Sequence, residues 1–172
     1  LITVDCGISN AEEIDVAGEA GMDVIVVDHH QIPPRLPDAA AVLDPVQEDC
    51  EFPFKGLAAC GVTFMLLVGL RKRLRDLNRF AAGGEPDLRQ WLDLTAIGTV
   101  ADMVPLKELN RLIVHYGLHR ISRSQRPGVR ALCDVAGIEP DKVTAGIAFS
   151  GSDSPRRIAR RIFDEYTTSR AS

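Results

Sequence analysis

The sequence predicts an α/β fold in which a parallel sheet with βαβ units is followed by a mostly helical segment. Two short runs of β-branched and apolar residues, 1–4 and 23–27, flank a stretch with helical character. Apolar residues then recur at helical spacing through much of the chain beyond residue 57. A strand, a helix and a second strand in this order favour parallel strands joined by a right-handed crossover.

The first βαβ unit is delimited by its start and stop signals. Asp5 closes the first strand, and Gly7 breaks it. The helix that follows has Glu12 and Glu13 in its first turn, where the helix dipole favours acidic residues, and it stops at Gly21. The second strand is an uninterrupted apolar run, which is typical of a parallel sheet covered on both faces.

The rest of the chain is expected to be mainly helical. A proline-rich loop leads to a short third strand at residues 40–43. We expect helices at residues 57–77, 88–101, 109–121 and 129–136. These elements divide the chain into an α/β core with its first helices (1–106), a helical continuation (107–149) and a basic tail (150–172) that we expect to be frayed.

Composition excludes some classes of protein. The chain has 172 residues, of which 45% are hydrophobic and 26% charged, as in ordinary globular proteins, and no apolar run is long enough to span a bilayer. The four cysteines lack a CxxC spacing, which argues against a zinc site and favours a cytoplasmic location with reduced thiols.

The net charge is −4, with acidic residues concentrated in the first 60 positions and basic ones after them. That division suits a metal site beside a surface for a polyanion, but charge alone favours ordinary solvated helix faces.

Ionisable residues close both strands of the predicted unit. Asp5 follows the first strand, and Asp28, His29 and His30 follow the second. Because the carboxyl ends of parallel strands meet at one edge of a sheet, these side chains are expected to lie close together. Carboxylates suit Mg²⁺ or Mn²⁺, an imidazole favours Mn²⁺, and a pair of such ions suits phosphoryl chemistry. Asp102 interrupts an apolar stretch, so we expect it to be buried and paired, hydrogen-bonded or metal-bound. Taken alone, Asp5 is better explained as a strand-end cap, and Asp102 is equally well explained as a cap.

Together these residues form an ordered set of motifs that resembles the DHH family of phosphoesterases. The matching stretches are residues 4–9 (VDCGIS), 27–30 (VDHH) and 98–106 (GTVADMVPL), which resemble the second, third and fourth motifs of the family. The residues in these motifs resemble those of the family's branch of single-stranded-DNA exonucleases. Residues 57–64, 110–113 and 126–132 also resemble this branch. The resemblance covers about residues 1 to 149 and implies that residues 1–106 are a partial catalytic core.

The resemblance implies a role for each matching residue. Asp5 corresponds to the carboxylate that bridges two divalent cations, Mn²⁺ or Mg²⁺, and His29 and Asp102 correspond to ligands of one of them. Asp28 corresponds to a nearby carboxylate that orients His29. His30 corresponds to the residue that contacts the scissile phosphate. The implied reaction is hydrolysis of a phosphodiester bond.

The resemblance also implies a substrate and partners. Family members of this branch degrade single-stranded DNA from the 5′ end in DNA repair and recombination. The resemblance therefore implies a cytoplasmic protein that has a single-strand-binding protein or a helicase as partner and does not bind a membrane. Arg111 is a candidate for binding the substrate phosphate.

Three departures from the family pattern limit the expected activity. The opening Asp-x-Asp motif and the second, substrate-binding domain are missing, and the chain ceases to resemble the family after Phe149. We therefore expect an incomplete catalytic domain with weak activity or none. Two alternatives stay open: a phosphoesterase of the same superfamily that acts on oligonucleotides or small molecules, and a non-catalytic DHH binding module.

Overall fold

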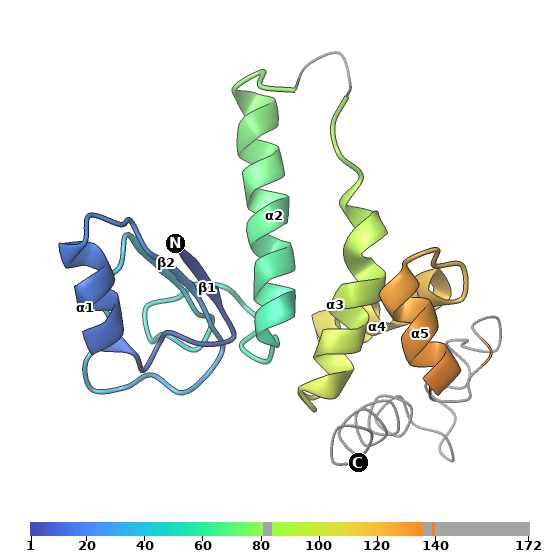
Figure 1. The fold of residues 1–172 in the computed structure, drawn as a ribbon, viewed down its shortest axis with the longest axis horizontal. Coiled ribbons are helices and arrows are strands. Elements are labelled where there is room, and N and C mark those ends of the chain that lie inside the picture. Colours follow the sequence, from blue (N-terminus) through green and yellow to red (C-terminus); the bar gives the residue numbers. More distant parts are fainter. Residues whose placement is uncertain (81–83, 136–138, 140–172) are drawn as a thin grey trace. The chain divides into compact units, whose positions relative to one another are not determined.

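The computed structural model describes residues 1–80, 84–135 and 139 of the chain (Figure 1). The chain divides into two compact units, the first spanning Leu1–Pro86 and the second beginning at Asp87. Each unit is described by itself.

The first unit is an α/β unit built on a three-stranded sheet. Its elements in chain order are β1 (Ile2–Val4), α1 (Ala11–Glu19), β2 (Ile25–Val27), β3 (Ala41–Leu43) and α2 (Ala59–Asp76). The strand order is β1-β2-β3, and both pairs are parallel. Ile2 is paired with Ile25, which is paired in turn with Ala41. All three strands therefore point their carboxyl ends to the same edge of the sheet.

Helices cover both faces of this sheet. Ile14 and Ala17 of α1 pack with Val24 and Val26 in a buried apolar cluster. Helix α2 lies against β1 and β2, on the other side of the sheet from α1 (Figure 1). The central strand is accordingly the most buried, as expected from its uninterrupted apolar sequence.

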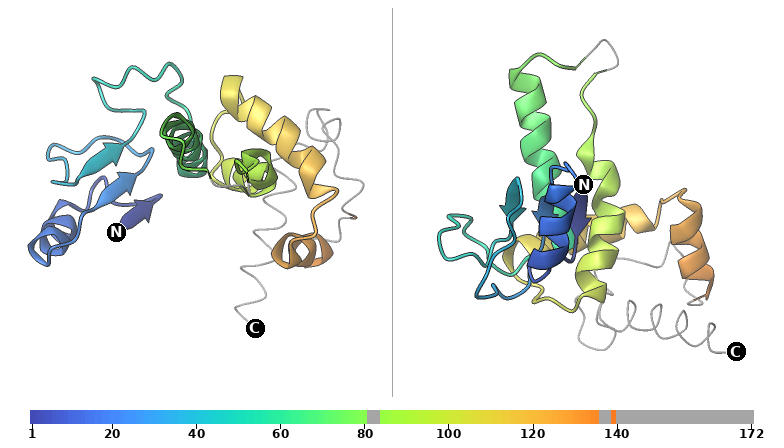
Figure 2. Two further views of the ribbon diagram at one scale, coloured as in Figure 1. Left: turned by 90° about the horizontal axis from the view of Figure 1, so that it is seen from above. Right: turned by 60° about the vertical axis from the view of Figure 1, so that its left-hand side comes forward.

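The second unit is helical in the part that the structure describes. It contains a 3₁₀ turn η1 (Leu88–Trp91), α3 (Leu92–Ala101), α4 (Glu108–Ile121) and α5 (Pro127–Val135). Helices α3 and α4 pack closely against each other (Figure 2). Their contact includes Gly117, where a methyl group would lie 2.3 Å from the carbonyl oxygen of Leu92. An apolar cluster of Val100, Val114 and Leu118 extends to residues of α5.

The predicted α/β fold with a parallel sheet is confirmed, and the element boundaries differ by only a few residues. The main local difference is at residue 88, where a 3₁₀ turn precedes the α-helix because the side chain of Asp87 accepts a hydrogen bond from the Arg89 N–H. The domain boundary after residue 106 stays a prediction, and the tail at 150–172 lies outside the described residues. Among the described helices, none is long and apolar enough to cross a membrane.

Candidate metal centre

Each strand of the sheet is followed at once by an aspartate: Asp5 after β1, Asp28 after β2 and Asp44 after β3. The backbone ladder continues through the first two. The N–H of Asp5 donates to the carbonyl oxygen of Val27 at 3.0 Å, and the N–H of Asp28 donates to that of Leu43 at 3.0 Å. The hydrogen bonds of the sheet therefore fix the backbone positions of Asp5 and Asp28.

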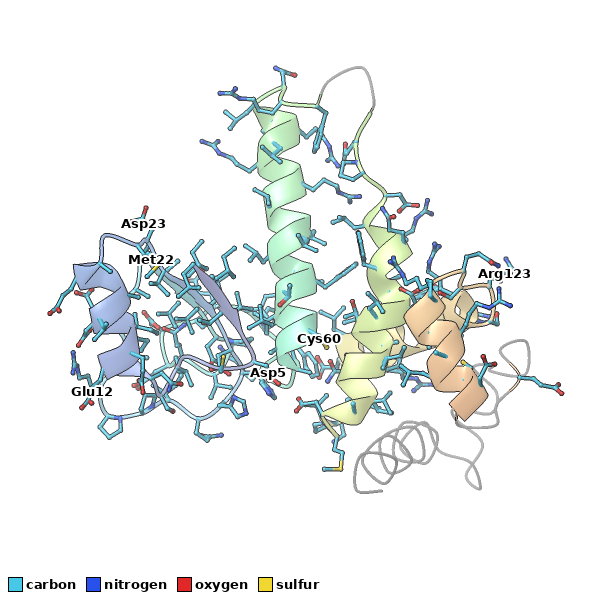
Figure 3. The ribbon with its side chains drawn as sticks, viewed as in Figure 1. Asp5, Glu12, Met22, Asp23, Cys60 and Arg123 are labelled. Atoms are coloured by element: carbon cyan, nitrogen blue, oxygen red, sulfur yellow. The ribbon has the colours of Figure 1, made fainter. Side chains whose placement is uncertain are left out.

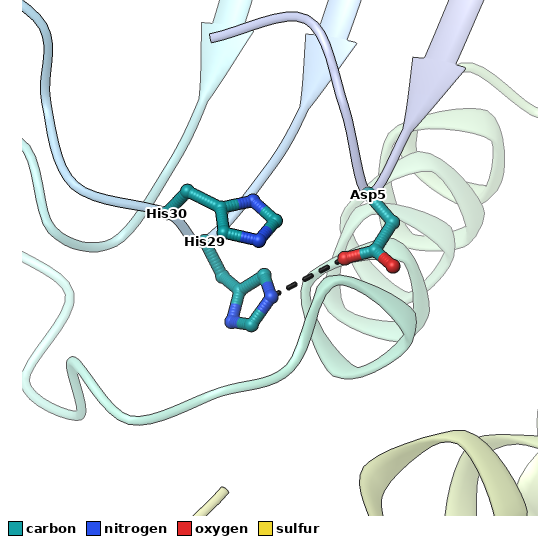
Figure 4. A group of neighbouring side chains, drawn as sticks. All are labelled: Asp5, His29 and His30. Atoms are coloured by element: carbon teal, nitrogen blue, oxygen red, sulfur yellow. Dashed lines mark ion pairs between the residues drawn. The ribbon is translucent and has the colours of Figure 1, made fainter. Parts of the chain in front are cut away.

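Asp5, His29 and His30 form a cluster at this edge that is able to hold a metal ion (Figure 4). One ligand atom from each residue lies within 4.8 Å of the others. Nε2 of His29 lies 3.2 Å from Oδ1 of Asp5. The Asp5 side chain is 60% exposed, whereas that of His29 is 12% exposed, so the cluster opens to solvent on the aspartate side.

Asp28 is the buried support of this cluster. It has no exposed surface. One of its oxygens accepts the N–H of Ile8 at 3.0 Å, and the other accepts the N–H of His29 at 2.9 Å and binds Nδ1 of His30 at 2.6 Å. Burial alone raises the pKa of Asp28, but the hydrogen bonds from Ile8, His30 and His29 outweigh burial and hold that pKa below its ordinary value.

The ionised state of Asp28 decides which nitrogen of His30 faces a ligand. An ionised carboxylate only accepts hydrogen bonds, so Nδ1 of His30 donates to Asp28 and carries the proton. Its other ring nitrogen, Nε2, is then the atom through which His30 can contact a metal ion or a phosphate oxygen. A carboxylate behind a histidine is the arrangement that orients metal-binding imidazoles in proteins.

Asp44 belongs to the same edge but was not among the predicted site residues. It is 2% exposed; its Oδ1 accepts the N–H of Val46 at 2.8 Å, and its Oδ2 has no hydrogen-bond partner among the described protein groups. Burial raises the pKa of Asp44, and the nearby charge of Asp28 raises it further, against the hydrogen bond from Val46. The sequence offered one signal, an aspartate at the end of a third strand, but the following Pro45 favoured its interpretation as a simple strand stop.

The remaining predicted site residues belong to the second unit. Asp102 is the C-terminal cap residue of α3, and Arg111 lies in the first half of α4. Both side chains are exposed, so the expectation that Asp102 is buried was wrong. The helix ends at Ala101, and Asp102 and Met103, which follow it, are both exposed although apolar residues continue to Leu106. A role for either residue in the metal centre stays a prediction.

The donors of the cluster fit a divalent transition ion. Two imidazoles and one carboxylate, with one imidazole oriented by a buried carboxylate, favour Mn²⁺ over Mg²⁺, which prefers oxygen ligands alone. The exposed side of Asp5 leaves room for water and for a substrate oxygen, which a catalytic site needs. Figure 3 shows Asp5 at the end of the sheet opposite to Asp23, which precedes β2.

A parallel sheet with aspartates and histidines at its carboxyl edge is the arrangement of an α/β protein that can hold a divalent cation at that edge. Residues 1–99 match the DHH family, N-terminal domain, and the chain belongs to this family.

The relatives with curated descriptions are exonucleases. The chain is 45% identical over 148 residues to the single-stranded-DNA-specific exonuclease RecJ of Dickeya dadantii, which covers 84% of this chain and 26% of the relative. It is 43% identical over 148 residues to RecJ of Escherichia coli, with the same coverage, and 44% identical over 137 residues to RecJ of Bacillus subtilis, covering 80% of this chain and 16% of the relative. The chain thus spans about a quarter or less of the length of these proteins.

Two solved structures share the fold. A crystal structure of exonuclease RecJ bound to manganese has a TM-score of 0.66 and 32% identity, covering 99% of this chain and 43% of the other. RecJ of Thermus thermophilus in complex with Mn²⁺ has the same TM-score and 28% identity, covering 28% of that chain. Both structures hold the ion that the donor set of this chain favours.

Proposed function

We propose that this chain is part of a nuclease that hydrolyses phosphodiester bonds of single-stranded DNA from the 5′ end, with two divalent cations, Mn²⁺ or Mg²⁺. The observation that carries the proposal is the cluster of Asp5, His29 and His30 at the carboxyl edge of the sheet. Support for the substrate comes from relatives that are described as single-stranded-DNA-specific exonucleases. The proposal extends to the biological setting: DNA repair and recombination in the cytoplasm, with a single-strand-binding protein or a helicase as partner.

The residues of the cluster divide the work between them. Asp5 and His29 would hold the metal, with Asp5 able to bridge two ions through its two oxygens. His30 would contact the scissile phosphate through Nε2, because Asp28 holds Nδ1. When bound, the cations supply positive charge that neutralises the phosphate and makes water more acidic. Asp102 and Arg111 complete the proposed set, as a metal ligand and a phosphate contact.

Asp28 acts in this scheme by positioning. Its hydrogen bond with the ring of His30 and its bond with the backbone N–H of His29 keep both imidazoles at the edge of the sheet. The sequence had assigned Asp28 to the orientation of His29. The side chain that it holds directly is that of His30, and this makes Asp28 the determinant of the phosphate contact as well.

Calorimetric titration with Mn²⁺ tests the metal centre. We expect micromolar binding by the unaltered chain, since the Asp5 carboxylate and the His29 imidazole already lie 3.2 Å apart, and loss of measurable binding by Asp5→Asn. Asp23→Asn is the matched control, because Asp23 is an exposed aspartate at the opposite edge of the same sheet. Equal binding by both variants would show that the cluster is not the metal site.

Hydrolysis assays separate the proposed substrate from its alternatives. The chain is incubated with Mn²⁺ and single-stranded DNA labelled at the 5′ or the 3′ end, and in parallel with a dinucleotide. Release of mononucleotides from the 5′ end, abolished in Asp5→Asn and retained in Asp23→Asn, supports the proposal. Faster turnover of the dinucleotide favours a small-substrate phosphoesterase. Metal binding without hydrolysis of either substrate, also after a segment with the Asp-x-Asp motif has been joined upstream, favours a binding module.

A further inference from the structure

The second unit contains a cavity of about 760 Å³. The residues that line it are far in the sequence from the aspartates of the first unit. It is lined by residues of η1, by the start of α3, by the second half of α4 and by the turn that leads into α5. Most of its ionisable side chains are basic: Arg89, Arg120, Arg123 and Arg126 line it, with His119 beside them.

Two of these arginines are anchored to the protein. Arg126 donates to Oδ2 of Asp93 at 3.0 Å and to the carbonyl oxygen of Gln90 at 2.9 Å, and its guanidinium lies 4.4 Å from the ring centre of Trp91. Arg89 is paired with Asp87, at 2.9 Å. Asp93 and Asp87 are thus each paired with one arginine, and the charge of Asp87 also acts on Arg120 without forming an ion pair with it.

The other two arginines leave the cavity with excess positive charge. The side chains of Arg120 and Arg123 are exposed and make no ion pair or hydrogen bond with the part of the chain that the structure describes. Figure 3 shows Arg123 on the outside of the turn that follows α4. Two unpaired guanidinium groups beside an open cavity favour an anionic ligand, and planar guanidinium groups match phosphate oxygens well.

Aromatic rings accompany these cations. Tyr116 lines the cavity one turn before Arg120 and is 56% exposed, and Trp91 is 38% exposed beneath Arg126. Exposed rings among arginines are the usual means by which proteins bind single-stranded nucleic acid without reading its sequence, because every base has a face that stacks. A site built for a small free anion would instead offer buried donors that converge on one point.

We propose that this cavity binds the backbone of a single-stranded nucleic acid, with Arg120 and Arg123 contacting phosphates and Tyr116 stacking on a base. The inference rests on the proposed function, because it assigns the cavity to the DNA strand whose end is hydrolysed elsewhere. The site contributes affinity and takes no part in the chemistry.

Fluorescence polarisation with a labelled oligo-dT strand tests this site without any hydrolysis. The titration is done in EDTA at 0.1 M salt with the full chain, the double variant Arg120→Gln/Arg123→Gln, and a control double variant Arg73→Gln/Arg79→Gln. The control removes the same charge from exposed positions at the end of α2 and just beyond it. All four positions are exposed, so both variants are expected to fold, which their circular dichroism checks.

The size of the expected effect follows from counterion release. Each phosphate contact on a single strand contributes about −0.7 to the slope of log K against log salt, so losing two contacts reduces the slope by about 1.4 and weakens binding about 25-fold at 0.1 M salt. We expect the control to change affinity by less than about threefold, as for charges without a local contact. Tyr116→Ala should weaken binding about tenfold if its ring stacks on a base.

Three outcomes overturn the inference. They are equal weakening by both double variants, an unchanged salt slope in the cavity variant, and absence of oligonucleotide binding by the unaltered chain. Displacement of the strand by millimolar inorganic phosphate or thymidine monophosphate also overturns it, because it assigns the cavity to a small phosphate ligand. Failure of Mn²⁺ binding in calorimetry with strand binding intact removes the proposed function alone, since this titration needs no metal.

Discussion

Two buried aspartates at the edge of the sheet should respond in opposite directions to the same substitution. Asp28 has no exposed surface and Asp44 is 2% exposed, and both carboxylates follow parallel strands. They differ in their hydrogen bonds. Both oxygens of Asp28 accept bonds, whereas Oδ2 of Asp44 has no partner among the described protein groups. Changing each to asparagine replaces one oxygen with an NH₂ group at nearly constant volume.

The magnitudes follow from what each oxygen accepts. In Asp28→Asn the remaining oxygen keeps the hydrogen bonds from His29 and His30. The new NH₂ group faces the N–H of Ile8, so one charge-assisted hydrogen bond is lost and two hydrogen-bond donors face each other. This should cost about 3 kcal/mol of unfolding free energy at pH 7. In Asp44→Asn the oxygen keeps the bond from Val46, and the NH₂ group replaces an oxygen without a donor. Removing the buried charge should stabilise the protein by about 1 kcal/mol.

The pH dependence also has opposite signs. The pKa of Asp28 is lowered in the folded state, so its contribution is present above its unfolded pKa near 3.8 and is lost as the pH falls below that value. The pKa of Asp44 is raised, so its ionisation costs stability as the pH rises above 3.8 through its folded pKa. The cost of Asp28→Asn should therefore be constant as the pH falls from 7 towards 3.8, and the gain from Asp44→Asn should shrink as the pH falls through the raised folded pKa of Asp44 towards 3.8.

Urea unfolding followed by circular dichroism measures both differences at several pH values. The unaltered chain is the reference at each pH, and equal slopes against urea check that the unfolded states are comparable. A loss of stability in both variants would refute the assignment of Asp44 as a carboxylate held without a partner. A stable Asp28→Asn variant would refute the view that Asp28 organises the turn and the two histidines.

Two glycine substitutions test the packing that supports the two units. Gly7→Ala should destabilise the protein by about 2 kcal/mol, because Gly7 has a φ of +115° and the new methyl group would lie 2.6 Å from Oγ1 of Thr3. Gly117→Ala should cost about 3 kcal/mol, because its methyl group would lie 2.3 Å from the carbonyl oxygen of Leu92. Urea unfolding measures both changes, with Gly18→Ala as the control, since its methyl group meets no atom within 4 Å and we expect unchanged or slightly higher stability. An unchanged free energy of unfolding in Gly7→Ala or Gly117→Ala would contradict the close contact that the substitution tests.

Much of the fold could be predicted because its signals are local. The apolar run before Asp28 and the helix between the first two strands define a βαβ unit by sequence alone. Parallel topology then brings Asp5, His29 and His30 to one edge, although Asp5 is more than twenty positions from the two histidines, and the structure has them together.

The parts that were missed depend on tertiary structure. Whether a helix-terminal aspartate such as Asp102 is buried depends on what packs beside the helix end, and the residues around it do not encode that. Asp44 was missed because a strand of three residues followed by proline gives a weak signal. The partner of Asp28 was only partly predicted, because the N–H of Ile8 reaches it through the turn after β1, from twenty residues away in the sequence.

Metal binding and strand binding should be separable, because they rest on different residues in different units. The first unit holds the carboxylates and imidazoles of the metal cluster, and the cavity with its unpaired arginines belongs to the second. Asp5→Asn should therefore abolish Mn²⁺ binding in calorimetry while leaving oligo-dT affinity in EDTA within about twofold, since removing one exposed negative charge changes only long-range electrostatics. Arg120→Gln/Arg123→Gln should do the reverse, weakening the strand about 25-fold with the Mn²⁺ affinity unchanged. If either variant reduces both affinities by tenfold or more in a folded protein, binding of the DNA strand and binding of the metal depend on each other, and the two sites are not separable.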